Sequence, residues 1–323
     1  MSLADAAAAL RAHDRIVVAC HEAPDGDALG SLVGCGRALR AAGWDVVLWA
    51  PGEAPLPADY AWLGYDDLVR VAPADLPERL LLAVDCGSAL RLGRDGEAAV
   101  SSAAASVNLD HHADNTRFAE INIVDADAAC ATVLCLRLLR LLDLPIVDAT
   151  AEALYVGIVT DTGRFMFSNT NAEAHAAAAD LIAQGVEPDA VFRRLYEGKP
   201  AARVRLLARA LATLDLRADG RLAVACISLD DLERSGADEA DSEGVIDHLR
   251  AIDGVEVAAV IREPRAGGGR LKKVSLRSAQ PHVDVARIAH AGGGGGHAMA
   301  AGFAMEADFA HVIELIETEL ARA

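Results

Sequence analysis

The stretch RIVVACHEAPDGDALGS, residues 15–31, decides the fold, because an apolar run leads straight into a polar turn and then into a helical pattern. A short run rich in β-branched residues is typical of a strand buried in a parallel sheet. Pro24 and Gly26 favour a turn, and a helix is expected from about Asp27 to Ala42. The stretch therefore predicts a strand that ends at His21, a polar turn and a helix.

The same alternation continues on both sides of this stretch. A first helix is expected after Ser2, and further helices are expected from Ala126 and from Ala149. Further buried strands are expected over residues 45–50, 80–85 and 106–110. Strands that alternate with helices predict an α/β fold, with a mostly parallel sheet covered on both faces.

The second part of the chain predicts a smaller α/β domain of its own. Strands are expected over residues 221–228, 256–263 and 273–278, and a glycine run expected to form a loop precedes a last strand and helix. Residues 185–216 read as wholly helical, with Pro188 and Pro200 near helix starts. Because 323 residues exceed the usual size of one domain, we predict a domain over 1–185, a helical linker over 186–216 and a second domain over 217–323.

Composition limits the classes of partner. The formal net charge of −18 argues against a protein that coats long nucleic acid, since phosphate backbones are bound by surplus Lys and Arg. The six cysteines form no CxxC pair and lie mostly in apolar runs, which is typical of reduced core thiols in a cytoplasmic protein. Neither a signal peptide nor a membrane segment is expected from the hydropathy pattern. A small phosphorylated substrate remains compatible with this charge, and a homodimer is left open.

Three of the predicted strands end in polar side chains: His21, Asp25 and Asp27 after the first, Asp85 after the third, and Asp110, His111 and His112 after the fourth. Because ligands collect at the carboxyl ends of parallel strands, we expect these ends to meet in one crevice. Carboxylates and imidazoles suit cations such as Mg²⁺ or Mn²⁺. Taken singly, the first cluster is equally interpretable as an acidic loop in which Asp27 caps the next helix, and Asp85 alone is better interpreted as a cap of the following segment. A triplet of one aspartate and two histidines favours a functional role.

A fourth cluster, GIVTDTGRF over residues 157–165, ends an apolar helix with Asp161, Thr162 and Arg164. The alternative interpretation is that Asp161 and Thr162 are ordinary turn residues and that Arg164 is a solvated surface residue. Four clusters of acidic residues or histidines in one half of the chain nevertheless favour one shared site.

The glycine run over residues 292–296 and the following His297 are a candidate anion site. Consecutive glycines let backbone N–H groups approach an anion, and an imidazole can donate to a phosphate. The segment 262–277 holds six basic residues against one acidic residue, and Arg277 lies inside a predicted strand. The alternative interpretation is a flexible loop beside a solvated basic hairpin.

Taken together, the motifs HEAPDGDALGS, VDCGS, NLDHHADN, GIVTDTGRF and GGGGGHAMAAGF resemble, in order, those of the DHH–DHHA1 phosphoesterase family. The size is similar to the NrnA-type group of bifunctional oligoribonucleases and pAp phosphatases, some of which act on cyclic di-AMP. The resemblance implies two α/β domains with the active site in the cleft between them. It also implies two-metal hydrolysis of short oligonucleotides (nanoRNA, pApA), 3′-phosphoadenosine 5′-phosphate and cyclic di-AMP, with release of nucleoside monophosphates.

The resemblance also implies roles for single residues. One Mn²⁺ is bound by His21, Asp25 and Asp85, and a second by Asp27, Asp85, His111 and Asp161, with Mg²⁺ or Co²⁺ as alternative metals. Asp110 orients His111, and His112 contacts the scissile phosphate. The implied substrate-binding residues are Arg164, Arg277, Gly294, Gly295, Gly296 and His297.

Two other functions share parts of this pattern. A RecJ-like single-strand DNA exonuclease has the same metal motifs but needs a long basic or aromatic track, whereas aromatic residues make up 4% of this chain. A non-catalytic nucleotide sensor keeps the crevice and loses metal ligands. All the predicted metal-ligand positions hold aspartate or histidine in this chain, which argues against a sensor.

Overall fold

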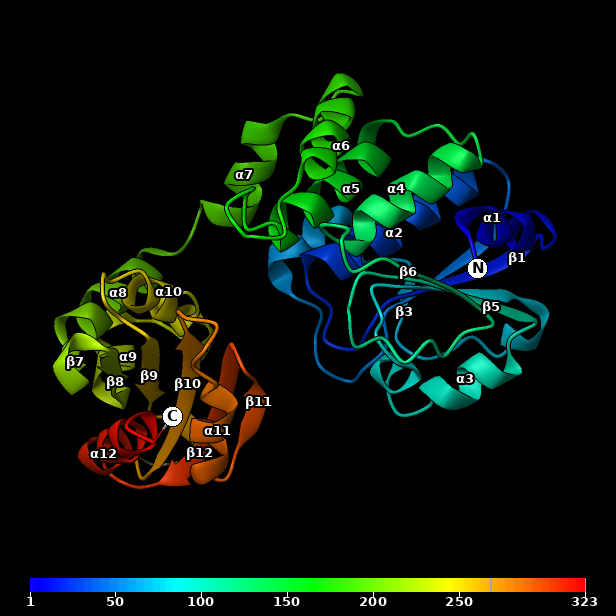
Figure 1. Cartoon of the computed structure of the whole chain (residues 1–323). Helices are drawn as coiled ribbons and strands as arrows, with labels where there is room; N and C mark the ends of the chain where they lie inside the picture. The colour runs from blue at the N-terminus through cyan, green and yellow to red at the C-terminus, as the bar shows by residue number, and fades with distance from the viewer. Residues whose placement is uncertain (268, 323) are drawn as a thin grey trace. The chain divides into compact units, whose positions relative to one another are not determined.

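The computed structural model describes residues 1–267 and 269–322, which divide into two compact units, Met1–Glu197 and Gly198–Ala323 (Figure 1). The division falls between two helices, α7 (Pro188–Tyr196) and α8 (Ala201–Ala212), inside the segment predicted as a helical linker.

The first unit is built on a six-stranded parallel sheet with the strand order β3-β2-β1-β4-β5-β6. Its strands are β1 (Arg15–Ala19), β2 (Asp45–Trp49), β3 (Leu68–Val69), β4 (Leu80–Val84), β5 (Ala105–Asp110) and β6 (Ile121–Val124). Its helices besides α7 are α1 (Leu3–Arg11), α2 (Gly26–Ala41), α3 (Gly96–Ser102), α4 (Ala131–Leu141), α5 (Asp148–Asp161) and α6 (Ala172–Ala183).

Alternate side chains of the sheet enter two apolar cores. Ile16 and Val18 of β1 pack under α2, α4 and α5, whereas Val17 and Ala19 pack on the opposite face with Ala99 of α3. Figure 1 shows these helices on the two faces of the sheet. Because β1 and β4 are buried on both faces of the sheet, their sequences are unbroken apolar runs.

The order of the strands places a crevice at one point of the sheet. The chain runs from β1 outward to β2 and β3 and then returns to β4 on the other side of β1. At such a reversal the loops after the two neighbouring strands diverge, and ligands bind in the crevice between them. His21 and Asp85 follow β1 and β4, so the prediction that polar strand ends meet here has a topological cause.

The second unit holds a mixed six-stranded sheet in the order β11-β12-β10-β9-β8-β7, in which β8 and β9 are parallel and the other neighbours are antiparallel. Its strands are β7 (Asp215–Arg217), β8 (Leu222–Ile227), β9 (Val257–Arg262), β10 (Leu271–Ser278), β11 (Gly295–His297) and β12 (Ala300–Glu306). Its helices besides α8 are α9 (Leu229–Ser235), α10 (Val245–Arg250), α11 (Val285–Ala291) and α12 (Phe309–Leu320). Helices α11 and α12 cover one face, and α8 to α10 cover β8 and β9 on the other.

The α/β class with two domains is confirmed, and some local predictions are wrong. The helix expected from Ala126 begins at Ala131, and β3, β6, β7 and β11 are strands that the sequence pattern did not predict. The glycine run is only partly a loop, because Gly295–His297 pairs with β12. An added Cβ at Gly296, whose φ is +145°, would meet Ala301 Cα at 2.5 Å, so this glycine lets two strands approach.

Two further expectations concern thiols and hydropathy. All six cysteines are free, and Cys226 alone among them is not fully buried. In the part of the chain that is described, each helix is too short or too polar to cross a bilayer.

Candidate metal centre

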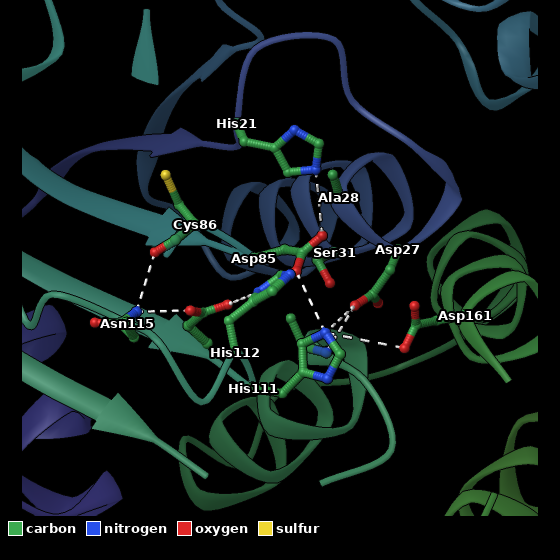
Figure 2. Close-up of polar contacts among 12 residues, drawn as sticks. His21, Asp27, Ala28, Ser31, Asp85, Cys86, His111, His112, Asn115 and Asp161 are labelled. Carbon is green, nitrogen blue, oxygen red and sulfur yellow. Dashed lines mark hydrogen bonds and ion pairs between the residues drawn. The ribbon is translucent and has the colours of Figure 1, made fainter. Parts of the chain in front are cut away.

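Six predicted ligands from five segments of the first unit converge at the crevice, and Figure 2 labels all of them except Asp25. They are His21 after β1, Asp25 and Asp27 at the start of α2, Asp85 after β4, His111 after β5, and Asp161 as the last residue of α5. Ligand atoms of His21, Asp25 and Asp85 lie within 4.8 Å of one another, and so do those of Asp27, His111 and Asp161. Asp85, His111 and His112 form a third such group.

Asp85 lies at the centre of the cluster. Its carboxylate is 3.6 Å from His21 Nε2 through Oδ2 and 3.7 Å from His111 Nε2 through Oδ1. The residue is 2% exposed, and among the residues that the structure describes Oδ1 has no hydrogen-bond partner. Its φ of +52° is strained for a residue with a side chain, and such strain concentrates at functional sites. A buried carboxylate oxygen without a donor costs free energy unless a cation compensates it.

Asp27 is held by the start of α4, far away in the sequence. Its Oδ2 accepts from the Ala131 backbone N–H at 2.7 Å, and its Oδ1 accepts from the Thr132 N–H at 3.0 Å and from the Thr132 hydroxyl. These bonds satisfy donors that a helix start leaves free, because Cys130 makes no side-chain cap. Burial raises the pKa of Asp27 to about 6 against the effect of these bonds.

The carboxylates of the cluster repel one another in a buried place. Burial, and then the charges of Asp27 and Asp25, raise the pKa of Asp85 well above its ordinary value. Burial and the same kind of repulsion raise the pKa of Asp161 to about 8. Crowded, desolvated carboxylates of this kind are stabilised by a divalent cation, which offsets both costs.

The two inner histidines present a free nitrogen to these carboxylates. His21 Nδ1 donates to the Glu22 carbonyl at 2.8 Å, so Nε2 is the acceptor nitrogen and points toward Asp85. His111 Nε2 lies 3.9 Å from Asp161 Oδ2 and 4.0 Å from Asp27 Oδ2. Burial lowers the pKa of both imidazoles. Neutral imidazoles beside carboxylates are the donor set that Zn²⁺, Mn²⁺ and similar ions prefer, so the residues present fit a divalent metal.

The family resemblance implies that Asp110 orients His111, whereas in the structure the imidazole that bonds to Asp110 is that of His112. Asp110 Oδ1 accepts from His112 Nδ1 at 2.8 Å. Residues two apart in an extended chain lie on the same side, whereas neighbours lie on opposite sides. The hydrogen bond to Asp110 raises the pKa of His112 to about 9.

Two family descriptions match the chain: the N-terminal domain of the DHH family over residues 15–158, and the DHHA1 domain over residues 219–322. The bifunctional oligoribonuclease and PAP phosphatase NrnA of Thermus thermophilus is 33% identical over 319 residues, which cover 95% of this chain and 91% of that protein. The chain belongs to the DHH family and carries a DHHA1 domain.

Other relatives agree with this membership. The protein of the same name from Bacillus subtilis is 26% identical over 293 residues, covering 90% of this chain and 89% of that protein. The crystal structure of an exopolyphosphatase-related protein from Bacteroides fragilis has a TM-score of 0.88 at 22% identity, covering 99% of this chain and 95% of that chain. The latter likeness concerns the fold.

The predicted substrate residue of the DHH domain lies outside the ligand cluster. Arg164 follows Asp161 in a turn in which Gly163, Arg164 and Phe165 all have positive φ. Its guanidinium lies 5.1 Å from the centre of the Tyr196 ring. Arg164 is exposed, so it is available to a ligand.

Two of the predicted substrate residues of the DHHA1 domain, Arg277 and His297, share one sheet face. Arg277 lies opposite Ala300, and Ala300 lies opposite His297, so the three form one row across β10, β12 and β11. Gly294 is required by packing, because an added Cβ would collide with the Gly302 carbonyl oxygen. At Gly295 an added Cβ would meet only His290 Nε2 at 3.5 Å, which is ordinary contact.

Two groups of this DHH domain were missed from the sequence. Thr132 lies in the run ATVLCL, which reads as core, and its polar role is revealed by hydrogen bonds of its hydroxyl with Asp27 and Ser31. Asn115 lies in the motif NLDHHADN, three residues after His112, and this proximity was the signal available.

Thr132→Val is expected to weaken divalent-metal binding by about 10–100-fold, as loss of a partner of a metal ligand does. The change keeps the shape of the side chain but removes the hydroxyl that holds Asp27 Oδ1. Titration calorimetry with Mn²⁺ measures the effect, and Thr132→Ser, which retains the hydroxyl, is the matched control. Equal affinities for the Val and Ser variants would contradict the role given to this hydroxyl.

Proposed function

We propose that this chain hydrolyses phosphoester bonds in short oligoribonucleotides and in 3′-phosphoadenosine 5′-phosphate, releasing nucleoside monophosphates. The observation that carries the proposal is the shared, unpartnered Asp85 Oδ1 at the strand-order reversal, between two groups of ligand atoms. The Thermus thermophilus relative is named for these two activities.

In the proposed centre two divalent ions share Asp85. His21, Asp25 and Asp85 bind one, and Asp27, Asp85, His111 and Asp161 bind the other. Mn²⁺ is the proposed metal, with Mg²⁺ and Co²⁺ as alternatives to be compared. When bound, such ions activate water at neutral pH and neutralise the charge that develops on a phosphoryl group.

The chain's own groups bind and orient the substrate. His112 Nδ1 donates to Asp110, and this hydrogen bond raises the pKa of the ring, which favours the protonated form whose Nε2 can donate to a phosphate oxygen. Its side chain is 33% exposed, which leaves it accessible from the crevice.

The proposed contact of the DHHA1 domain is a terminal phosphate of the substrate. Among the described residues no carboxylate pairs with Arg277, whose guanidinium donates to the Leu276 carbonyl. The small Ala300 lies between Arg277 and His297 in the same row, so a phosphate can approach both. Gly294, Gly295, Gly296 and Arg164 complete the proposed substrate set.

The purified chain with Mn²⁺ is expected to hydrolyse pAp and pApA faster than longer RNA, single-stranded DNA or pyrophosphate. The net negative charge of the chain disfavours binding of long phosphate backbones, whereas the metal centre and the row that holds Arg277 and His297 suit a short substrate. Product analysis by chromatography measures the rates, and cyclic di-AMP tests whether cyclic substrates are opened. Preference for long single-stranded DNA would favour a RecJ-like exonuclease, and tight nucleotide binding without turnover would favour a sensor.

A further inference from the structure

Asn115 links the core of the DHH domain to the Asp110–His112 pair. It lies in the segment 111–120, which contains no helix or strand. Its Nδ2 donates to Asp110 Oδ2 at 2.6 Å, to Asn108 Oδ1 at 2.8 Å and to the Cys86 carbonyl at 3.2 Å. Figure 2 shows Asn115 pointing toward Cys86 and the carboxylate beside His112. A side chain in an irregular segment is thus tied to two parts of the fold, strand β5 and the residues that follow β4.

The orientation of this amide follows from its neighbours. Three acceptors surround Nδ2, whereas Oδ1 accepts from the Arg117 backbone N–H at 2.6 Å. A rotated amide would place its oxygen against three oxygens and its NH₂ group against a donor. Only the observed orientation satisfies the network.

The inner end of the network is rigid. Asn108 is fully buried on β5, and its Nδ2 donates to the carbonyls of Ala83 and Cys86 at 3.3 and 3.1 Å. Thr116 adds a backbone bond to the Gly87 carbonyl at 2.8 Å, which fixes the segment beside Asp85. The position of Asn115 is therefore set by β5 and the residues after β4 as well as by bonds within its own loop.

The outer end of the network is His112. Asp110 is fully buried and accepts from Asn115 on Oδ2 and from His112 Nδ1 on Oδ1, so both oxygens are held in fixed directions. A carboxylate held on one oxygen alone can rotate about its terminal bond, whereas one held on both cannot. The direction of the His112 ring consequently depends on the bond that Asn115 donates.

We propose that Asn115 is a positioning residue, which sets the His112 imidazole for contact with the substrate phosphate through Asp110. The inference rests on the proposed hydrolysis. Asn115 itself contacts neither the ligand cluster nor, in this account, the substrate, so its effect falls on turnover rather than on metal binding.

Three variants separate positioning from space filling. Asn115→Ala removes the donor and is expected to lower kcat by about 10–100-fold while Mn²⁺ affinity stays unchanged. Asn115→Asp keeps the shape but places a carboxylate oxygen against Asp110, so its kcat is expected to be lower than that of the Ala variant. Thr116→Ala keeps the backbone bond to the Gly87 carbonyl, loses only the longer hydroxyl bond of 3.3 Å to the same oxygen and does not contact Asp110, so it is the control and should retain kcat. An Asp variant as active as wild type would overturn the proposal.

A double-mutant cycle tests the route through His112. If Asn115 acts through this ring, Asn115→Ala should change kcat by less than about threefold in a His112→Ala background. The same loss in both backgrounds would overturn the proposal.

The ring can also be observed without turnover. The Nδ1–H proton of His112 is expected as a slowly exchanging, low-field NMR signal that Asn115→Ala shifts or broadens and Thr116→Ala leaves in place. An unchanged signal in the Ala variant would overturn the positioning role. If the wild type is inactive but Asn115→Ala still shifts the His112 signal, the positioning role is supported and the proposed hydrolysis is contradicted.

Discussion

Asp85→Asn is expected to lower the rate of phosphoester hydrolysis by about 10³-fold or more. The carboxylate is the residue common to two groups of ligand atoms, and its Oδ1 is buried without a partner. An amide of the same shape offers one neutral oxygen and a donor that no ligand position can use. Both halves of the proposed centre are therefore affected by one substitution.

The same variant separates a lost site from a lost fold. Without metal, the buried Asp85 carboxylate contributes repulsion toward Asp27 and Asp25, which Asn removes. The metal-free variant is therefore expected to unfold at a temperature no lower than that of the metal-free wild type. Asp95→Asn, an exposed residue of the same domain, is the control for the change in charge. Full activity of the Asp85→Asn protein would contradict the shared-ligand assignment.

Removal of divalent metal is expected to abolish hydrolysis and to lower thermal stability, and addition of Mn²⁺ is expected to restore both. Ligand binding to the folded state stabilises it by about 2.7 kcal/mol at a free concentration of 100 times Kd. Thermal unfolding after chelation and after stepwise return of Mn²⁺, Mg²⁺ or Co²⁺ measures the effect and ranks the metals. Full activity of a chelated, metal-free sample would contradict the proposal.

The metal effect should grow with pH. Burial raises the pKa of Asp27 to about 6 and that of Asp161 to about 8, so protons compete with metal below these values. A carboxyl group whose pKa is higher in the folded than in the unfolded state destabilises the metal-free fold as pH rises from its unfolded-state pKa to its folded-state pKa. The gain in unfolding temperature on adding Mn²⁺ is therefore expected to be larger at pH 8 than at pH 6. A gain that falls over this range would contradict this electrostatic account.

Local signals were enough for the elements around the opening stretch. The apolar runs at β1, β2, β4 and β5 and the helix that starts beside Asp25 lie within about two residues of their expected bounds, and β1 ends at Ala19 rather than at His21. Asp25 caps α2 through bonds to the Asp27 and Ala28 backbone N–H groups, which is a short-range effect. The convergence of the strand ends could also be predicted from the sequence, because it depends only on the strands being parallel.

The misplaced helix start shows what a local pattern lacks. Helix α4 begins at Ala131 because a carboxylate 104 residues earlier in the chain, Asp27, accepts from its first N–H groups. The strand β11 likewise depends on glycines that fit against residues of β12. The pairing of Asp110 with His112 depends on the path of the chain after β5. These features depend on contacts between distant segments, so composition and spacing did not predict them.

Mn²⁺ stoichiometry of the metal-free chain, measured by titration calorimetry and checked by elemental analysis, tests the central claim most directly. The wild type is expected to bind two ions per chain, and Asp85→Asn is expected to bind fewer, with no hydrolysis of pAp. Two ions bound with unchanged affinity by Asp85→Asn, or none bound by the wild type, would contradict a dinuclear centre that shares this carboxylate.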